Sequence, residues 1–483
     1  MKNILVKNLA FLIFLNLLVK PFWIFGIDRT VQNTVGPEAY GQYYALFSFT
    51  MLFQIILDMG LANYNTRNIS RHSHLLSKYL PSFLVIKLLF SFAYVIIVSL
   101  LAYGLGYDAS LYPMAALLGL NQILHSGIQF NRSNLSGLHL FRTDSIFSVL
   151  DRLLVIFICA FLLWSSYVEQ SFDIMWFIYA QTTALSISFV SSAVIVAGYS
   201  PNLKFRTNKR FILMILKQCF PFALLGILMI FYTRMDSVMI ERLLPNGAEQ
   251  AGIYASAYRL LEASVMYSLL FSSFLLPIFS RMLKQNEDIK PITTFSFKMV
   301  VVPAIILALT ACFYRHDIMQ LLYTHATEEF GRVFGILFLS LIPMSAGFVY
   351  GTLLTANGNM RILNQMSAVG LILNFALNYW LILHYNSALG AAIATIITQF
   401  MIMFIQLFYV AKIFSWMPTA KSLFRFAITL VSILVVNYIC FEYLSVPLSG
   451  FCIAILTACF IGFLVKMIDL SGLKILLKSR LKS

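Results

Sequence analysis

Residues 387–413 read SALGAAIATIITQFMIMFIQLFYVAKI. This stretch contains no Asp, Glu or Arg, and its single lysine, Lys412, lies next to its end. A helix of about 20 apolar residues is long enough to cross a hydrocarbon core of about 30 Å. Apolar runs of this kind recur from one end of the chain to the other. The sequence therefore predicts an all-α polytopic membrane protein.

The composition of the whole chain agrees with this prediction. Of the 483 residues, 60% are hydrophobic and 11% are charged, and the mean hydropathy is +0.84. An average soluble domain is about 45–50% apolar and about 25% charged. The chain lacks the polar surface that a soluble fold needs, which excludes a soluble enzyme, a disordered regulator and a nucleic-acid-binding protein. Its segments also lack the alternating pattern of a membrane barrel.

Apolar length and polar breaks predict about fourteen membrane-spanning helices. We expect them at residues 5–27, 39–62, 78–103, 110–135, 143–165, 171–197, 211–235, 250–279, 292–314, 328–356, 360–384, 387–413, 420–442 and 446–467. The first run leads into further spans and has no convincing cleavage site, so we interpret it as a helix and not as a signal peptide. The 6 cysteines lie in apolar runs and form no C-x-x-C pair, which predicts neither disulfides nor a metal site.

The net charge of +15 comes from basic residues that lie in short clusters between the apolar runs. If the N-terminus is cytoplasmic, most loop Lys and Arg residues fall on the cytoplasmic side, while acids such as Asp28 and Glu38 fall outside. The positive-inside rule then predicts that both termini are cytoplasmic. Residues 469–483 alternate Leu or Ile with Lys or Arg, which is typical of an amphipathic helix at an anionic membrane surface.

The chain also contains an internal repeat. Residues 36–43 and residues 247–254 both follow the pattern G-x-E-x-x-G-x-Y, and each lies at the start of a predicted span. Spans 1–6 and 7–12 therefore read as two parallel six-helix repeats, related by an axis along the membrane normal, with two extra C-terminal helices. The expected domains are an N-terminal lobe at 1–200, a C-terminal lobe at 201–415, the last two helices at 416–468 and a basic cytoplasmic tail at 469–483.

Several charged side chains fall inside the predicted spans. Each costs about 2.5 to 3.5 kcal/mol at a helix centre, so the deep ones should face a protein interior or a wet cavity. Lys20 and Arg234 occupy equivalent spans of the two repeats, and Asp236 follows Arg234 closely. Arg259 and Glu262 are three residues apart, so they share a helix face and are expected to pair. These residues form either a cationic site for an anionic substrate or structural ion pairs.

Two other charged residues, Asp151 and Arg152, lie in the middle of a predicted span, where structural pairing is as good an interpretation as function. A polar helix face is predicted in the fourth span, at Asn121, His125, Gln129 and Arg132. Lipid cannot satisfy such a face. It either packs on another helix through hydrogen bonds or lines a hydrophilic cavity that suits hydroxyl-rich substrates such as sugars. Span 11 adds Asn374 and Asn378, one turn apart.

The sequence contains no catalytic or metal-binding motif of the common kinds. G-x-S-x-G, H-E-x-x-H and the P-loop pattern are all missing, as is a D-x-D motif for a sugar-nucleotide metal. We therefore expect no catalytic residue, no metal site and no cofactor. A membrane-embedded enzyme of glycan assembly remains an alternative, but it would usually have a substantial extramembrane loop.

Taken together, these features resemble the oligosaccharide flippase family, the Wzx or polysaccharide-biosynthesis transporters of the MATE/MurJ-like superfamily. The resemblance covers essentially the whole chain. It rests on motifs in a fixed order along the spans, namely 36–43, Ile56-Leu57-Asp58-Met59-Gly60-Leu61, Arg67 with Arg71, Arg234-Met235-Asp236 and 252–260.

The resemblance implies two six-helix lobes that work by alternating access. The implied substrate is a polyprenyl-pyrophosphate-linked oligosaccharide, such as an O-antigen (lipopolysaccharide), capsule or exopolysaccharide repeat unit. It would move from the inner to the outer leaflet of the bacterial cytoplasmic membrane. The implied cationic cavity matches Lys20, Arg234 and Arg259 by span and depth. Lys20 replaces the arginine expected in the lipid II flippase relatives, which argues against that particular substrate.

Other interpretations stay open. A MATE-type antiporter of small molecules or cations is the main alternative, although its cavity should be rich in acids and not in bases. Coupling to H+ or Na+ through Glu262 and Asp236 is a further hypothesis. The expected partners are the lipid-linked oligosaccharide, membrane lipids and, as a weaker alternative, other polysaccharide-assembly proteins. No nucleic acid is expected.

Overall fold

The computed structural model describes residues 15–16, 18–71, 76–165, 172–200, 209–417, 419–444, 446–465 and 467. Within these ranges, the side chains at positions 63, 67, 71, 78, 209–223, 225, 422 and 423 are not described. The described chain contains helices and turns and no strand, which confirms the all-α prediction. The predicted amphipathic tail at 469–483 lies outside the described residues.

The chain divides into two compact units. The first contains residues 1–241 and 246–252, and the second contains residues 242–245 and 253–483. The division therefore falls near the start of the second G-x-E-x-x-G-x-Y motif, after the seventh predicted span. The expected lobe boundary at residue 200 marks where one copy of the proposed sequence repeat ends. It is therefore a different kind of boundary from the spatial division of the chain near residue 250.

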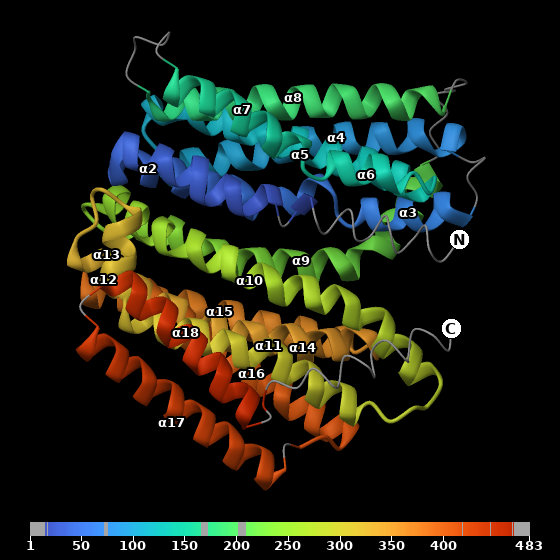
Figure 1. Ribbon diagram of the computed structural model, residues 1–483. Helices are drawn as coiled ribbons and strands as arrows, with labels where there is room; N and C mark the ends of the chain where they lie inside the picture. Colours follow the sequence, from blue (N-terminus) through green and yellow to red (C-terminus); the bar gives the residue numbers. More distant parts are fainter. Residues whose placement is uncertain are drawn as a thin grey trace. The chain divides into compact units, whose positions relative to one another are not determined.

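The N-terminal unit is built from long helices joined by short turns (Figure 1). After the first described residues, its elements are the π-helix η1 (Trp23–Asp28), α2 (Arg29–Leu52), the 3-10 helix η2 (Gln54–Leu57), α3 (Leu61–Arg71), α4 (Leu76–Gly104), the 3-10 helix η4 (Ala109–Leu111), α5 (Tyr112–Gly137), α6 (Phe141–Phe147), α7 (Leu150–Trp164), α8 (Ile174–Gly198) and α9 (Lys209–Leu243).

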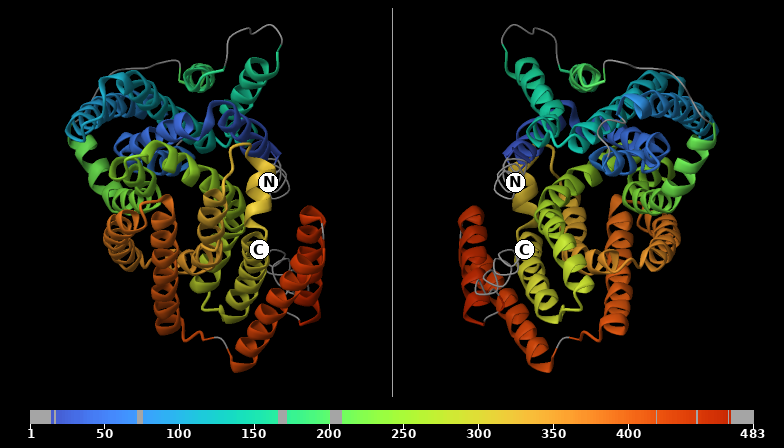
Figure 2. Two further views of the ribbon diagram at one scale, coloured as in Figure 1. Left: turned by 90° about the vertical axis from the view of Figure 1, so that its left-hand side faces the viewer. Right: turned by 90° about the vertical axis from the view of Figure 1, so that its right-hand side faces the viewer.

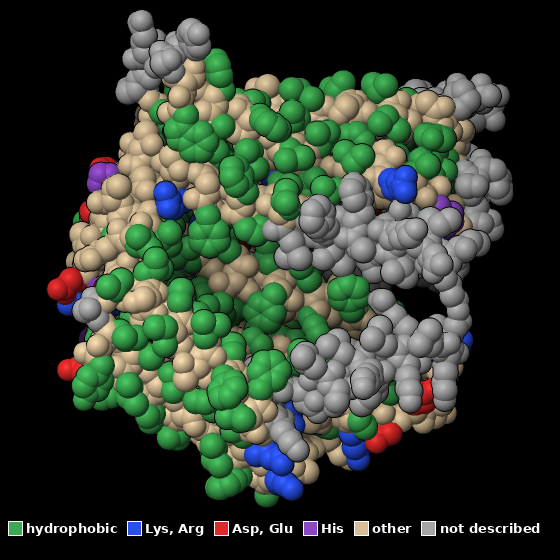
Figure 3. All heavy atoms as spheres, in the orientation of Figure 1, with side chains coloured by type: hydrophobic (Ala, Val, Ile, Leu, Met, Phe, Trp, Pro, Cys, Tyr) green, Lys and Arg blue, Asp and Glu red, His purple; other side chains and the backbone are tan. Residues whose placement is uncertain are grey.

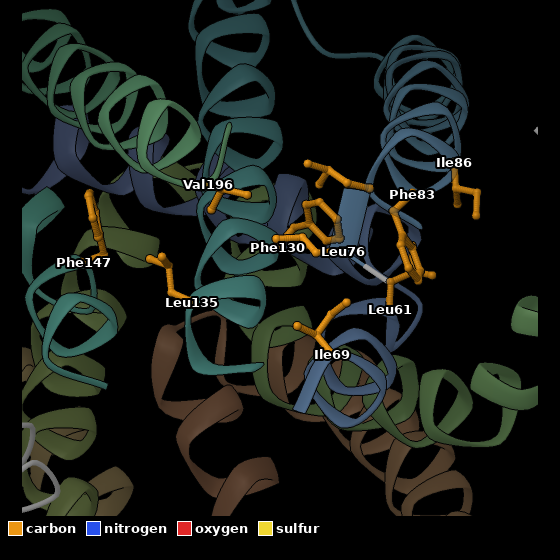
Figure 4. Packing of buried hydrophobic residues seen from close by; sticks show 10 residues of the cluster. Leu61, Ile69, Leu76, Phe83, Ile86, Phe130, Leu135, Phe147 and Val196 are labelled. Carbon is orange, nitrogen blue, oxygen red and sulfur yellow. The ribbon is translucent and has the colours of Figure 1, made fainter. Parts of the chain in front are cut away.

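Helix α5 organises this unit, because it contacts α2, α3, α4, α6 and α8. One apolar cluster shows how these helices meet (Figure 4). Phe83 of α4 and Phe130 of α5 pack with ring centroids 5.8 Å apart, and Ile69 of α3 and Val196 of α8 belong to the same buried cluster. Apolar burial here fixes the positions of the polar side chains on the other faces of α5.

The first turns of α10 (Gly247–Lys284), up to Gly252, belong to the N-terminal unit. The C-terminal unit consists of the rest of α10 and of α11 (Lys290–Phe313), α12 (Arg315–Leu322), α13 (Glu328–Phe338), α14 (Leu341–Ala356), α15 (Met360–Tyr385), α16 (Ala388–Phe414), α17 (Ala420–Tyr443) and α18 (Pro447–Leu464). Helix α16 packs on α13, α14 and α15, and α11 packs on α14. The two last helices contact each other and α11, and Figure 2 shows α17 and α18 side by side.

Ten of the described helical segments are long and apolar enough to cross a membrane. They match the expected spans from 78–103 onward, except for 110–135 and 211–235, and the count of fourteen is not confirmed. Span 5–27 falls partly outside the described residues, and span 211–235 falls partly on positions whose side chains are not described. Spans 39–62 and 110–135 form the more polar α2 and α5. Hydrophobic side chains cover much of the face in Figure 3, as lipid contact requires.

The structure corrects the expected loop between the first two spans. Residues 29–52 are helical, with a break at Gly36, whose φ of 81° is in the region that glycine adopts without strain. The carboxylate of Asp28, which was expected in an outer loop, is buried, with 1% of the residue exposed. It accepts a hydrogen bond of 2.8 Å from the hydroxyl of Tyr40. The Gly36-Pro37 sequence turns the chain within the helical run and does not open a loop.

The motif at residues 56–61 forms a tight turn between η2 and α3. Met59 and Gly60 have positive φ values of 45° and 82°, and α3 begins at Leu61. Asp58 accepts a hydrogen bond from the backbone nitrogen of Ala62 at 3.3 Å, in the first turn of α3. The motif therefore interrupts the helical run and supports the start of the next helix.

Candidate substrate-binding site

The predicted polar face of α5 forms a continuous chain of contacts toward α6. The Nε2 atoms of His125 and Gln129 lie 3.4 Å apart. Arg132 donates from Nη1 to Gln129 Oε1 at 3.3 Å and from Nε to Asp144 Oδ1 at 2.7 Å. Three of the four predicted residues thus act together. The charge of Arg132 already has a carboxylate partner, so what this face presents to a substrate is mainly hydrogen-bonding groups.

Asn121, the fourth residue of this face, behaves differently. The residue is 5% exposed, and neither atom of its side-chain amide has a hydrogen-bond partner among the described residues. A buried amide without partners costs about 1–3 kcal/mol. Such a group is suited to bind a polar ligand or water, which is consistent with the cavity interpretation of the predicted face.

Other polar residues of α5 hold the helices together, and sequence reasoning did not single them out. Asn131 donates to Ser192 of α8 at 2.9 Å. Asn65 of α3 donates to Ser133 and Asn134 of α5, each at 2.8 Å. Interhelical hydrogen bonds of this kind position neighbouring membrane helices. These contacts support the packing interpretation for this part of α5, and the cavity interpretation of the face with Asn121, His125, Gln129 and Arg132 stays a prediction.

Lys20 lies on the first helix and is partly buried in the N-terminal unit. Among the residues that the structure describes, it makes no hydrogen bond and no ion pair. Its strongest electrostatic interaction with another charged group is with Arg152, followed by those with Asp151 and Arg132. One turn before it, Asn16 donates to the hydroxyl of Ser148 at 3.2 Å, which joins the first helix to the start of α7.

Asp151 and Arg152 lie in the middle of one apolar segment, Phe141–Trp164, as expected. The helix is interrupted there at Ser148 and Val149, so the two residues stand in the first turn of α7. The distance between Arg152 Nη1 and Asp151 Oδ1 is 3.8 Å, which is longer than a hydrogen bond. The two side chains therefore form an ion pair without a hydrogen bond, which agrees with the pairing interpretation.

A second buried cation of this unit is fully compensated. Lys87 Nζ lies 3.0 Å from Asp58 Oδ1 and donates to Leu57 O at 2.9 Å and to the hydroxyl of Ser126 at 2.7 Å. The ammonium group is also 5.8 Å from the ring centroid of Phe130. These contacts connect α2, α4 and α5, so Lys87 has a structural role and is not available to a substrate.

Arg234 and Asp236 lie on α9, in the part that belongs to the N-terminal unit. Arg234 donates from Nη1 to the hydroxyl of Tyr44 at 3.1 Å. The ring of Tyr44 is stacked on that of Tyr40, with centroids 6.2 Å apart. Asp236 is buried, with 1% exposed. Arg234 thus contacts a buried aromatic cluster on α2.

Arg259 and Glu262 belong to the C-terminal unit, on α10. Arg259 Nη1 lies 3.1 Å from Glu262 Oε2, which confirms the pairing predicted from their spacing. In the same unit, Asn374 and Asn378 are buried, and Asn378 donates to the backbone oxygen of Asn374 at 2.9 Å. The hydroxyls of Tyr254 and Thr395 lie 3.3 Å apart. Both units thus contain buried polar groups inside apolar helices.

Among the described residues, no three His, Cys, Asp or Glu side chains come together in an arrangement that could hold a metal ion. The groups that gather in the membrane helices are instead cations, amides and hydroxyls. Such groups bind anions and sugars through hydrogen bonds and charge.

Comparison with known proteins places the chain in a family. The model of a family described as "Polysaccharide biosynthesis protein" matches residues 5–283, and a model described as "MatE" matches residues 221–380. No curated protein matches the chain in sequence.

The structure is similar to the lipid II flippase MurJ in an inward closed conformation, with a TM-score of 0.74 and 15% identity over 95% of this chain and 98% of that one. An inward-facing multidrug resistance MATE family transporter of the MOP superfamily gives a TM-score of 0.60 and 12% identity over 83% and 98% of the two chains. A MOP superfamily transporter from Pyrococcus furiosus, whose binding pocket is said to have reverse polarity, gives a TM-score of 0.54 and 14% identity over 85% of this chain and 95% of that one. At these identities the likeness shows a shared fold.

Proposed function

Because the chain belongs to the polysaccharide biosynthesis protein family, we propose that it is a flippase for a polyprenyl-pyrophosphate-linked oligosaccharide. It would carry an O-antigen, capsule or exopolysaccharide repeat unit from the inner to the outer leaflet of the bacterial cytoplasmic membrane. The fold shared with MOP-superfamily transporters supports a transport function in a multi-pass membrane protein.

The observation that carries this proposal is positive charge inside membrane helices. Among the described residues Lys20 makes no hydrogen bond and no ion pair, and the charged group that acts on it most strongly is another cation, Arg152. A diphosphate is too costly to move through hydrocarbon without compensation. Lysine and arginine side chains would bind it through charge-assisted hydrogen bonds, which are the strong kind.

The polar face of α5 would serve the other part of the substrate. His125, Gln129 and the unpartnered amide of Asn121 offer donors and acceptors to sugar hydroxyls. The prenyl chain would stay in the bilayer, where it needs no polar contacts. Two repeats that rock against each other would expose such a site alternately to the two sides of the membrane, as in other transporters built from repeats.

The experiment that tests this proposal is deletion of the gene in its own host. A missing flippase leaves its substrate on the inner leaflet, so one lipid-linked oligosaccharide should accumulate there while its polymer disappears from the cell surface. Restoring the gene should reverse both effects. A deletion strain with normal surface polysaccharide and no accumulated lipid-linked intermediate would contradict the proposal.

Coupling to an ion gradient is part of the same proposal. Glu262, paired with Arg259, and the buried Asp236 are carboxylates in membrane helices that could exchange H+ or Na+. Glu262→Gln should then weaken transport that is driven by an imposed ion gradient. If the transport rate and its dependence on the gradient stay unchanged, Glu262 is only the structural partner of Arg259.

A second candidate function is export of small molecules or cations by a MATE-type antiporter, which the match to the MatE model over residues 221–380 favours. This function would need acids in the binding region, whereas Lys20, Arg132 and Arg152 are gathered in the N-terminal unit. Export of cationic dyes from cells that overproduce the protein would support the antiporter, and unchanged dye retention would support the flippase.

A further inference from the structure

Arg152 occupies an electrostatically unfavourable position. It lies in the first turn of α7, which begins at Leu150. The N-terminal end of a helix carries partial positive charge and stabilises anions, so Asp151 is favoured there and Arg152 is not. The ion pair of Arg152 with Asp151, at 3.8 Å, lacks a hydrogen bond and compensates the guanidinium group only in part. The local helix therefore leaves this cation incompletely balanced.

Lys20 lies beside this end of α7. Asn16 and Lys20 are one turn apart on the first helix, and Asn16 donates to Ser148, four residues before Arg152. The π-helix η1, which follows Lys20, contacts α7. Of the charged groups that act on Lys20, Arg152 acts most strongly. Two cations that repel each other thus stand on helical segments that pack against one another.

The acids nearby do not balance these cations. Asp144 accepts from Arg132 Nε at 2.7 Å, so that carboxylate already has its own cation. Of the acids that the structure describes near these cations, Asp151 is the one left to offset both Lys20 and Arg152, and His125 adds no negative charge. An uncompensated positive charge within membrane helices is costly. It is explained if an anionic ligand completes the site.

We propose that Lys20 and Arg152 form an anion subsite within the N-terminal unit that binds the diphosphate of the substrate. The inference rests on the proposed function and assigns a residue, Arg152, to the substrate site. The planar guanidinium group can bind two phosphate oxygens at once, while the lysine acts as a compact point charge. A diphosphate offers oxygens to both groups, so the subsite prefers a diphosphate to a monophosphate.

The test measures binding of undecaprenyl diphosphate and undecaprenyl monophosphate to the purified full-length protein by native mass spectrometry. The wild-type protein should prefer the diphosphate. Arg152→Ala and Lys20→Ala should each weaken diphosphate binding by roughly tenfold or more and reduce the preference. Arg152→Lys should retain part of the affinity, since the charge remains but the fork is lost. Arg361→Ala, which removes an exposed arginine at the start of α15, is the matched control and should bind like wild type.

The variant Arg152→Ala/Asp151→Asn separates binding from a structural role. If Arg152 served only to balance Asp151, this double variant would be stable and would bind diphosphate like wild type, and the inference would be overturned. The subsite predicts a stable protein with weak diphosphate binding. If the wild-type protein and Arg152→Ala bind undecaprenyl diphosphate equally well, the subsite alone is overturned. Wild-type protein that binds neither lipid overturns the proposed function as well.

Discussion

Gly41 of α2 and Gly252 of α10 lie where the backbones of the two helices touch. A Cβ atom on Gly41 would overlap the carbonyl oxygen of Ala248 and lie 2.5 Å from the nitrogen of Gly252, and a Cβ on Gly252 would overlap the carbonyl oxygen of Pro37. Gln32 adds a hydrogen bond of 3.1 Å to the oxygen of Gly252. The two copies of the G-x-E-x-x-G-x-Y motif therefore pack on each other, through the glycine that both contain.

Replacing Gly41 with Ala should destabilise the protein, because the new methyl group meets backbone atoms that cannot turn away. Overpacking of this kind costs about 1–3 kcal/mol. Thermal unfolding of the purified protein in detergent should show a lower midpoint. Gly198→Ala is the matched control, because a Cβ there has no neighbour within 4 Å. Equal midpoints for Gly41→Ala and wild type would show that this contact does not support the fold.

Removing the cation from the pair between Lys87 and Asp58 should be more harmful than removing both charges. Lys87→Met leaves the Asp58 carboxylate without its partner, and breaking a buried pair in this way costs about 3–5 kcal/mol. The double variant Lys87→Met/Asp58→Asn should recover much of the loss. Protein abundance in membranes and the unfolding midpoint measure both effects. A double variant less stable than Lys87→Met would contradict the compensation of charge seen in the structure.

Both termini should lie in the cytoplasm. The asymmetry of Lys and Arg between the predicted loops motivates this expectation. Reporter fusions after Asn202 and after Lys482 should both give a cytoplasmic signal. A periplasmic signal from either fusion would contradict a cytoplasmic N-terminus followed by an even number of spans before that fusion point.

Most helices could be predicted from the sequence because apolar length is a local property. The span expected at 360–384, for example, is the helix Met360–Tyr385. The pair of Arg259 and Glu262 was also predictable, since residues three apart share a helix face. Local patterns do not give contacts between distant residues. The partner of Lys87 and the contact of Asn16 with Ser148 depend on how helices pack, and so does the compensation of Arg132 by Asp144.

The break within the fifth predicted span was missed for a similar reason. Ser148 and Val149 stand between apolar residues and carry no strong turn signal, so the sequence reads as one helix. The break moves Asp151 and Arg152 to a helix start, where their charges have a different meaning. The cations within the spans could thus be noticed in the sequence. Which of them have an acidic partner, as Lys87 and Arg132 do, could be learned only from the packing.

The role of Arg259 can be separated from the stability of its ion pair with Glu262. If Arg259 binds the diphosphate, Arg259→Ala should abolish transport, and Arg259→Ala/Glu262→Gln should restore protein abundance without restoring transport. Arg259→Lys should retain part of the activity, because the charge remains. Abundance and transport are measured in the same strains. Transport at the wild-type rate in the double variant would show that Arg259 only balances Glu262.

The most direct test of the whole account uses the purified protein in proteoliposomes and a fluorescent oligosaccharide linked to a polyprenyl diphosphate. The accessibility of the label to an external quencher reports movement between the leaflets. The account predicts that wild-type protein accelerates this movement over protein-free liposomes and that Lys20→Ala abolishes the acceleration. Wild-type protein that leaves the rate of the protein-free liposomes unchanged, while it exports a cationic dye under an ion gradient, would contradict it.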